Sequence, residues 1–198
     1  SRAILEKGQV YGIPANLFEE NCQIFLVPMV DPDGVDLVTG GIAQGSIQWE
    51  QAKRLSNNCP SIPFPNGWKA NLLGVDLNLQ YPAGWLQARE IKFSQGYTRP
   101  GPRDYVGKAP LTQRESRALA DFTSYLDPAL ILAYHTQGEQ IYWKYDDIDV
   151  PGALALGQEF ARLSGYSLEE TPYASGFAGY KDWFIKVWRR PGFTIEAG

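Results

Sequence analysis

The sequence predicts an α/β fold, a mostly parallel mixed sheet with helices on both faces, from three observations. Two nearly continuous apolar runs, 22-CQIFLVPMV-30 and 129-ALILAYH-135, have the length and composition of strands buried on both faces. Segments with helical periodicity alternate with such runs, which favours a parallel sheet. A chain of 198 residues, 44% of them hydrophobic, is long enough for one sizeable core. We therefore expect a single domain over residues 1–198.

The first half of the chain predicts one strand, one helix and long loops. The run 22–30 is expected to be a buried strand that stops at a tight turn, 31-DPDG-34. Residues 46–58 predict a helix with Ser46 as its N-cap. From about Cys59 to Pro110 the frequent prolines and glycines predict long irregular loops, which in compact domains are often functional.

The second half predicts three helices and two strands. Thr112 and Glu115 have the spacing of a capping box at the start of a helix over 112–126, whose shared apolar face consists of Leu119, Phe122 and Leu126. Residues 129–135 predict a strand, and 151–165 predict a helix with Pro151 near its start and Gly165 at its end. A short amphipathic helix from residue 180, a Pro-Gly break and a last strand from Phe193 to Glu196 follow.

Charge and cysteine content exclude several classes of protein. A formal net charge of -4 gives no bulk electrostatic reason to expect nucleic acid or an anionic membrane as a partner. The two cysteines, Cys22 and Cys59, are too few for a disulfide scaffold, and buried free thiols are favoured over a disulfide. No run approaches the roughly 18 apolar residues of a membrane span, and Ser1 and Arg2 do not open a signal peptide.

Two polar residues end predicted strands. His135 follows one apolar run and Glu196 ends the last strand, and ligands of open α/β sheets bind outside the carboxyl ends of strands. An imidazole suits a zinc ion, and an isolated carboxylate suits a general base for zinc-bound water. From these residues alone, a hydrogen-bonded structural histidine and a solvated terminal glutamate are favoured over a zinc site.

Five ordered motifs add a resemblance that covers the chain from about Cys22 to its end. They are 28-PMVDPDGVDLV-38, 68-WKANLLGVDLNLQYPAGW-85, 132-LAYHTQG-138, 175-SGFAGYKDW-183 and 193-FTIEAG-198. Together they resemble the zinc carboxypeptidase family, and most of all its bacterial γ-D-glutamyl-L-diamino acid endopeptidases. These cut the γ-D-glutamyl bond to diaminopimelate in cell-wall peptides.

The resemblance implies roles for several residues. His135 matches the third zinc ligand, at the end of a central strand, and Glu196 matches the general base that passes its proton to the leaving amine. Asn78 matches an asparagine that binds the substrate carboxylate, and Tyr173 approximates a mobile tyrosine over the substrate. Asp182 and Trp183 match a further family pattern, with a packed helix start and a pocket-lining role both open.

Two departures from the family pattern concern arginines. Leu79 stands where carboxypeptidases carry the arginine that grips a free C-terminal carboxylate, which disfavours a simple exopeptidase. Leu73, just before Gly74, replaces an arginine expected to polarise the scissile carbonyl. Basic residues of the loop 98-TRPGPRDYVGK-108, Arg103 with Arg99 and Lys108, are candidates for gripping diaminopimelate carboxylates, and solvated loop charge is the alternative.

The zinc site implied by the resemblance needs a His-x-x-Glu motif that this sequence does not contain. We therefore expect the C-terminal portion of a metallopeptidase catalytic domain that is inactive by itself. A part of a longer enzyme is favoured over a degenerate product or a site completed by a second chain.

The function expected from the sequence is hydrolysis of γ-D-glutamyl-diaminopimelate bonds of murein peptides, with zinc as the cofactor. The alternative is a catalytically inactive module that binds such peptides, and an unrelated amidohydrolase-like domain is disfavoured by the five motifs. Oligomeric state and localisation stay open, with the cytoplasm favoured over export.

Overall fold

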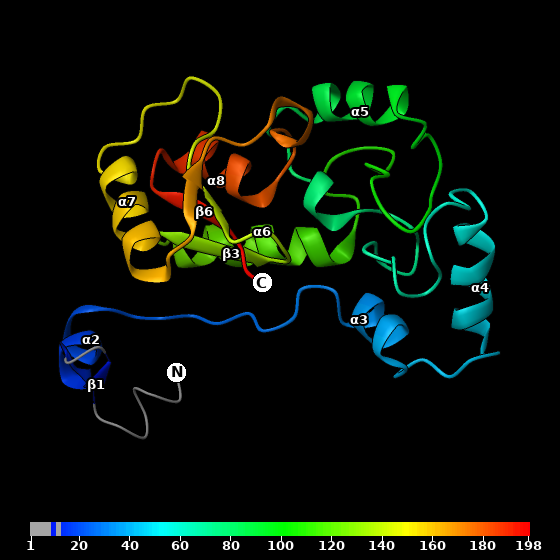
Figure 1. Cartoon of the computed structure of the whole chain (residues 1–198), viewed down its shortest axis with the longest axis horizontal. Helices are drawn as coiled ribbons and strands as arrows, with labels where there is room; N and C mark the ends of the chain where they lie inside the picture. The colour runs from blue at the N-terminus through cyan, green and yellow to red at the C-terminus, as the bar shows by residue number, and fades with distance from the viewer. Residues whose placement is uncertain (1–8, 11–12) are drawn as a thin grey trace.

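The computed structural model describes residues 9–10 and 13–198 and contains a four-stranded sheet (Figure 1). The strand order is β3-β6-β4-β5, with β3 at Ile131–His135, β6 at Gly192–Glu196, β4 at Gln140–Tyr142 and β5 at Ser167–Glu169. β3 and β6 are parallel, as are β4 and β5, whereas β4 and β6 are antiparallel. The predicted mostly parallel mixed sheet is confirmed. The expectation about a signal peptide at Ser1 and Arg2 lies outside the described residues.

Helices cover both faces of this sheet. On one face, α7 (Ala153–Ser164) packs through Phe160 and Ala161 against the cluster of Ile141, Phe193 and Ile195. On the other face lies α8 (Tyr180–Trp188), since a Cβ on Gly192 would meet Phe184 at 3.2 Å. Next to α8 lies α6 (Arg114–Leu126), and the hydroxyl groups of Thr123 and Tyr180 are 2.8 Å apart. The sheet therefore has a helical layer on each face.

The remaining elements lie outside the four-stranded sheet, and all but one of them belong to the first half of the chain. Short strands β1 (Gln9–Val10) and β2 (Ile13–Pro14) pair antiparallel, and α2 is Ala15–Asn21. Helices α3 (Pro32–Thr39) and α4 (Ile47–Ser56) share a hydrophobic cluster around Leu37 and Trp68. The predicted loops from Cys59 to Pro110 are interrupted by a 3₁₀ turn, η1 (Leu77–Leu79), and by α5 (Trp85–Ser94). A second 3₁₀ turn, η2, is Tyr173–Ser175.

Two predicted helix starts have different outcomes. Ser46 caps α4 as expected, since its hydroxyl accepts a hydrogen bond from the amide of Trp49. The capping box of Thr112 is wrong, because α6 begins at Arg114 and the Thr112 hydroxyl lies 3.0 Å from Oε1 of the buried Gln80. The same oxygen accepts from the Thr112 and Gln113 amides. Gln80 therefore fixes the start of α6 in place of a local cap.

The buried face of α6 also differs from the prediction. It consists of small residues, Ser116, Ala120 and Thr123, rather than of Leu119, Phe122 and Leu126. Phe122 is 38% exposed. Small side chains permit close contact, and the Ser116 hydroxyl donates to the Leu77 carbonyl of η1.

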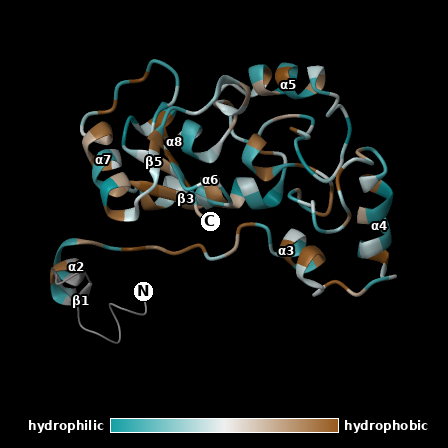
Figure 2. Cartoon of the chain, viewed as in Figure 1, coloured by the Kyte–Doolittle hydropathy of each residue, from teal (hydrophilic) through white to brown (hydrophobic). Residues whose placement is uncertain are grey.

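The predicted strand at Cys22–Val30 is wrong. This segment is extended but belongs to no strand, and its apolar side chains are exposed, with Leu26 at 69% and Ile24 at 60% (Figure 2). The predicted turn that follows is instead the start of α3, whose N-cap is Asp31. A strand requires a hydrogen-bonded neighbour, and the only strand that β3 pairs with among the described residues is β6. His135 therefore ends an edge strand rather than the expected central one.

Two further predictions concerned the state of the cysteines and the absence of a membrane span. Cys22 and Cys59 are free as predicted, but Cys22 is exposed and Cys59 half-buried. Within the described part of the chain, no helix has the length and apolar character needed to cross a membrane.

Candidate functional site

His135 and Glu196 lie next to each other at the carboxyl ends of β3 and β6. They are register partners across the parallel pair, so their side chains point to the same face of the sheet. This face is opposite to the one on which Phe193 and Ile195 pack near α7. The amide of Ala197 donates to the His135 carbonyl at 2.9 Å and continues the ladder past the strand end. The peptide bond between Thr136 and Gln137, just after the strand, is cis.

The positive charge of Lys69 lowers the pKa of both His135 and Glu196. Burial lowers the pKa of His135 and the positive charge of Lys69 lowers it further, so the imidazole is neutral at neutral pH. Burial raises the pKa of Glu196, and Lys69 opposes that rise. The site therefore combines a neutral imidazole, a carboxylate of increased basicity and a nearby cation.

Lys69 is held by a charged network that sequence reasoning missed. Its Nζ lies 3.0 Å from Oδ2 of the buried Asp76, which also accepts from the Asp104 amide at 3.2 Å. Asp104 in turn pairs with Lys92 at 2.6 Å and with Arg103 at 2.8 Å. Although burial alone would raise the pKa of Asp104, these two cations hold it below its usual range. The signal for Lys69 was its place in the motif 68-WKANLLGVDLNLQYPAGW-85.

The other candidate residues lie at separate places. Arg103 pairs with Asp104 as described, and its side chain is 45% exposed. Asn78 Oδ1 accepts from the Tyr180 amide at 3.0 Å and so connects η1 to the start of α8. Tyr173, in η2, is 74% exposed and its ring lies edge-on to Phe177 at 5.1 Å. Leu73 is 58% exposed.

Asp182 and Trp183 belong to a packed helix start. Asp182 Oδ2 accepts from the Gly179 amide at 3.1 Å, and its Oδ1 lies 2.7 Å from Nζ of Lys181. Trp183 is buried in the cluster formed with Tyr81 and Ile185. These contacts fix the first turn of α8, which covers the face of the sheet that carries the site.

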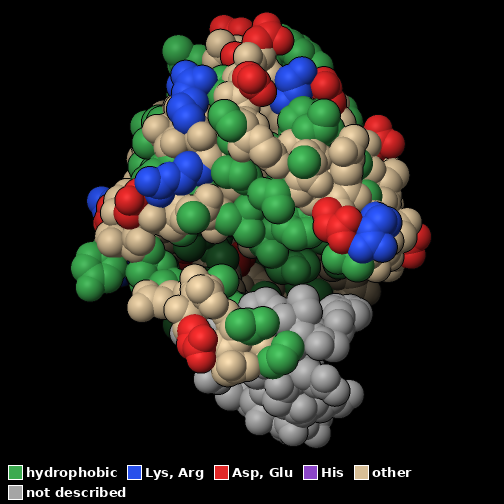
Figure 3. Space-filling view, turned by 90° about the vertical axis from the view of Figure 1, so that its left-hand side faces the viewer, with side chains coloured by type: hydrophobic (Ala, Val, Ile, Leu, Met, Phe, Trp, Pro, Cys, Tyr) green, Lys and Arg blue, Asp and Glu red, His purple; other side chains and the backbone are tan. Residues whose placement is uncertain are grey.

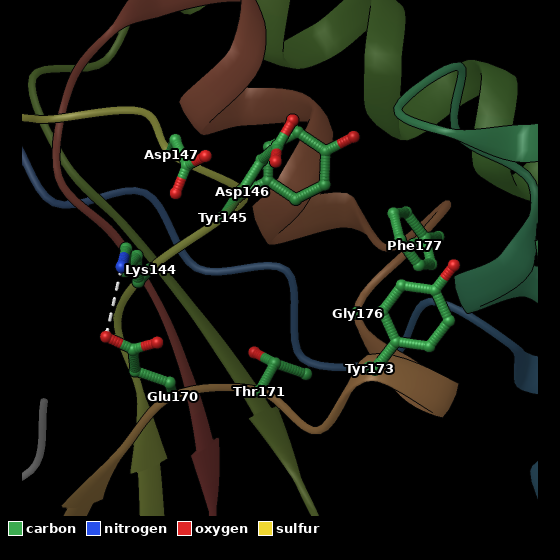
Figure 4. A pocket seen from close by; sticks show the side chains of 9 residues that line it. All are labelled: Lys144, Tyr145, Asp146, Asp147, Glu170, Thr171, Tyr173, Gly176 and Phe177. Atoms are coloured by element: carbon green, nitrogen blue, oxygen red, sulfur yellow. Dashed lines mark hydrogen bonds and ion pairs between the residues drawn. The ribbon is translucent and has the colours of Figure 1, made fainter. Parts of the chain in front are cut away.

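A cavity of about 270 Å³ lies between the loops that follow β4 and β5 (Figure 4). Charged and hydroxyl-bearing residues of both loops make up most of its lining, together with Gly176 and Phe177: Lys144, Tyr145, Asp146, Asp147, Glu170, Thr171 and Tyr173. Lys144 Nζ pairs with Glu170 Oε1 at 3.1 Å. Of this group the sequence singled out only Tyr173, because the loops are distant along the chain and carry no spacing signal.

The described residues do not complete a zinc site. They contain no group of three or more His, Cys, Asp or Glu side chains arranged to hold a metal ion, and His135 is the only histidine in the sequence. Catalytic zinc ordinarily takes three protein ligands. His135 therefore supplies at most part of a zinc-binding set.

Comparison with known proteins finds one matching family and two curated relatives of similar sequence. A family profile described as zinc carboxypeptidase matches residues 15–196. Gamma-D-glutamyl-L-diamino acid endopeptidase 1 of Lysinibacillus sphaericus is 42% identical over 196 residues, which are 99% of this chain and 47% of that protein. The uncharacterized protein YqgT of Bacillus subtilis (strain 168) is 39% identical over 185 residues, covering 93% of this chain and 47% of that protein. The chain thus spans about half the length of these curated relatives.

Two solved structures show weaker likeness. Murein-tripeptide amidase MpaA from Escherichia coli O157 has a TM-score of 0.46 at 21% identity and covers 65% of this chain and 52% of that one. Thrombin activatable fibrinolysis inhibitor has a TM-score of 0.46 at 18% identity and covers 62% of this chain and 33% of that one.

Proposed function

Since this chain belongs to the zinc carboxypeptidase family, we propose that it forms part of a hydrolase that cleaves γ-D-glutamyl-diaminopimelate bonds in murein peptides. The observation that carries this proposal is the side-by-side placement of His135 and Glu196 at parallel strand ends under the charge of Lys69. The endopeptidase relative, 42% identical over nearly the whole chain, supports the choice of bond.

Glu196 is the proposed general base. Burial raises the pKa of its carboxylate, so it accepts a proton more readily from an attacking water, and the charge of Lys69 opposes that rise. The protonated acid then donates that proton to the leaving amine. His135, neutral and near Glu196, is the proposed zinc ligand of this half of the site. A zinc ion is expected only where further ligands complete the set, and the steps assigned to this chain's own residues are those of Glu196 and Lys69.

Lys69 is the proposed donor to the carbonyl oxygen on which negative charge develops. The ion pair with buried Asp76 fixes its ammonium group, and a prepositioned cation costs little reorganisation during the reaction. This assignment replaces the donor that Leu73 cannot supply. Tyr173 is proposed to contact the substrate from its exposed position at the cavity, and Asn78 through its amide nitrogen. Arg103 has fewer donors available for a substrate carboxylate, because it pairs with Asp104.

The test uses the zinc-loaded protein with a complete metal site and the peptide L-Ala-γ-D-Glu-diaminopimelate. Glu196→Gln is expected to lower kcat about 10²–10⁴-fold, and Lys69→Met about 10²–10³-fold. The matched controls, Glu159→Gln on the exposed face of α7 and Lys53→Met on α4, should leave kcat unchanged. Full activity of Glu196→Gln would refute the general-base assignment.

A non-catalytic module that binds murein peptides is the second candidate. The incomplete zinc-ligand set of the described residues is the observation that favours it. Peptide binding by the zinc-loaded protein without release of any diaminopimelate-containing product would decide for the binding module.

A further inference from the structure

A groove of about 540 Å³ lies beside the first turn of α5. This volume falls within the range of roughly 300–1,000 Å³ that is typical of pockets for small ligands. Trp85 and Phe177 give the groove aromatic walls, and Tyr145, Asp146 and Lys186 add polar groups. None of the residues proposed to act in catalysis lines the groove, so it is a separate place on the molecule.

The residues of the first turn of α5 line this groove, and their amide groups have no partner. Gly84, the residue before the helix, has no side chain to cap these amides, and a Cβ there would lie 2.6 Å from the Phe177 ring. The first helical hydrogen bond runs from the Ala88 amide to the Gly84 carbonyl at 3.0 Å. Among the described residues, three amides of this turn therefore lack an acceptor: those of Trp85, Leu86 and Gln87. Such a helix start carries partial positive charge and suits an anion.

A buried hydroxyl group adds an independent donor at the same place. Tyr145 is 5% exposed, and within the described part of the chain its hydroxyl group makes no hydrogen bond. Its oxygen lies 3.2 Å from the position that a Cβ on Gly84 would occupy, and its ring points away from Lys144 (Figure 4). Burial and the negative charges of Asp182 and Asp146 raise the pKa of Tyr145 to about 12, so the hydroxyl group keeps its proton. Because buried hydroxyl groups are normally paired, this one indicates an acceptor on a ligand.

The charges around the groove match a single negative charge. Lys186, in the last turn of α8, is exposed and forms no ion pair with any described residue. Asp146 also lines the groove, and its negative charge acts on Tyr145. One lysine, one aspartate and a helix start together leave roughly half of one positive charge. A monoanion fits this balance better than a dianion does.

We propose that this groove binds an organic monocarboxylate, with the carboxylate on the first-turn amides of α5 and the Tyr145 hydroxyl group, and the apolar body against Trp85 and Phe177. The two oxygens of a carboxylate accept about four hydrogen bonds, which matches several converging donors. A free organic acid and the carboxyl end of a peptide share this chemistry. The site needs neither zinc nor Glu196, so the inference is independent of the proposed function.

The test titrates the 198-residue chain with benzoate and with benzamide, which has the same shape but no charge. Trp85 lines the groove, so binding should change the tryptophan fluorescence, and calorimetry gives the stoichiometry and the affinity. Benzoate should bind one to one and at least about tenfold more tightly than benzamide, because hydrogen bonds to charged groups are the stronger ones. N-acetylphenylalanine distinguishes the two sources: tighter binding than benzoate assigns the site to a peptide end, and weaker binding assigns it to a free acid.

Two variants and two matched controls locate the binding. Tyr145→Phe keeps the ring and removes the donor, so it should lower the affinity for benzoate about tenfold or more. Lys186→Met should lower it up to about fivefold and should weaken its dependence on salt. The controls are Tyr125→Phe, at an 84% exposed position of α6, and Lys53→Met, at an exposed position of α4, and both should leave the affinity unchanged.

Several outcomes would overturn the inference. They are equal affinities for benzoate and benzamide, tighter binding of inorganic phosphate than of benzoate, and an unchanged affinity for benzoate in Tyr145→Phe. Loss of benzoate binding in Lys69→Met would place the anion beside His135 and would also refute it. If Tyr145→Phe does not fold, as judged by urea unfolding, the comparison with benzamide and the salt dependence of Lys186→Met decide the inference.

Discussion

Asp31 makes the stability of this protein depend on pH in a direction opposite to most carboxylates. It is the N-cap of α3, and its Oδ1 accepts from the Gly34 amide at 3.1 Å. Burial raises the pKa of Asp31 to about 7, the Gly34 hydrogen bond opposes that rise, and the negative charge of Glu115 adds to it. The folded protein therefore holds a proton on Asp31 that the unfolded chain releases near pH 4.

The sign and size of the effect follow from linkage. Because the folded-state pKa is the higher one, the contribution of Asp31 to stability is fully present below the unfolded value of 3.8 and is lost as pH rises to about 7. One retained proton changes the free energy of unfolding by about 1.4 kcal/mol per pH unit, and the whole interval corresponds to about 4 kcal/mol. Asp31→Asn keeps an N-cap acceptor but has no charge to bury.

The assay is urea unfolding followed by tryptophan fluorescence, since the chain has six tryptophans. Asp31→Asn should match the unmodified protein near pH 4 and exceed its stability by about 2–4 kcal/mol at pH 8. The control is Asp121→Asn, which removes the same charge from an exposed position of α6 and should show no such pH dependence. A stability difference between Asp31→Asn and the unmodified protein that is constant from pH 4 to 8 would refute the reasoning.

Three further predictions concern the N-cap of α4, the exposed edge of β3 and the binding of zinc. Ser46→Ala should lower the free energy of unfolding by about 0.5–2 kcal/mol in urea titrations, because the Trp49 amide loses its acceptor, and Ser46→Asn should lose little. The 198-residue chain should self-associate in light scattering, because β3 exposes Leu132 and Tyr134 at a free sheet edge, and lysine at both positions should reduce the apparent mass. The same chain should bind Zn²⁺ weakly in calorimetry, since His135 lacks two further ligands among the described residues, and tight stoichiometric binding would contradict this.

Local signals were enough to predict the larger elements. Periodicity, caps and apolar runs predicted four elements whose ends lie within a few residues of the predicted ends: the helices α4 and α7 and the strands β3 and β6. The strands β4 and β5 escaped prediction because each has only three residues, too few for a pattern to show. The start of α6 was wrong for a different reason: Gln80, more than thirty positions earlier, takes the hydroxyl that the local pattern assigned to a cap.

The candidate site likewise contains residues that local signals predicted and residues that they missed. His135 and Glu196 were predicted together because each ends a strand, and parallel strand ends meet at one edge of a sheet. Lys69 was missed because its effect on them depends on the fold, which brings a loop residue near both strand ends. The cavity around Lys144 and Glu170 was missed because its two loops meet only through the pairing of β4 and β5.

The wrong prediction at Cys22–Val30 shows what an apolar run leaves unspecified. Its apolar residues have the composition of a buried strand, yet they are exposed, and the ring of Phe25 lies edge-on to that of Phe122 in α6, with centroids 6.2 Å apart. Figure 3 shows hydrophobic side chains gathered on the face at the α7 end, above a hollow beside the N-terminal segment. Apolar composition alone does not make a strand, because a strand also needs a hydrogen-bonded neighbour, and among the described residues Cys22–Val30 pairs with none.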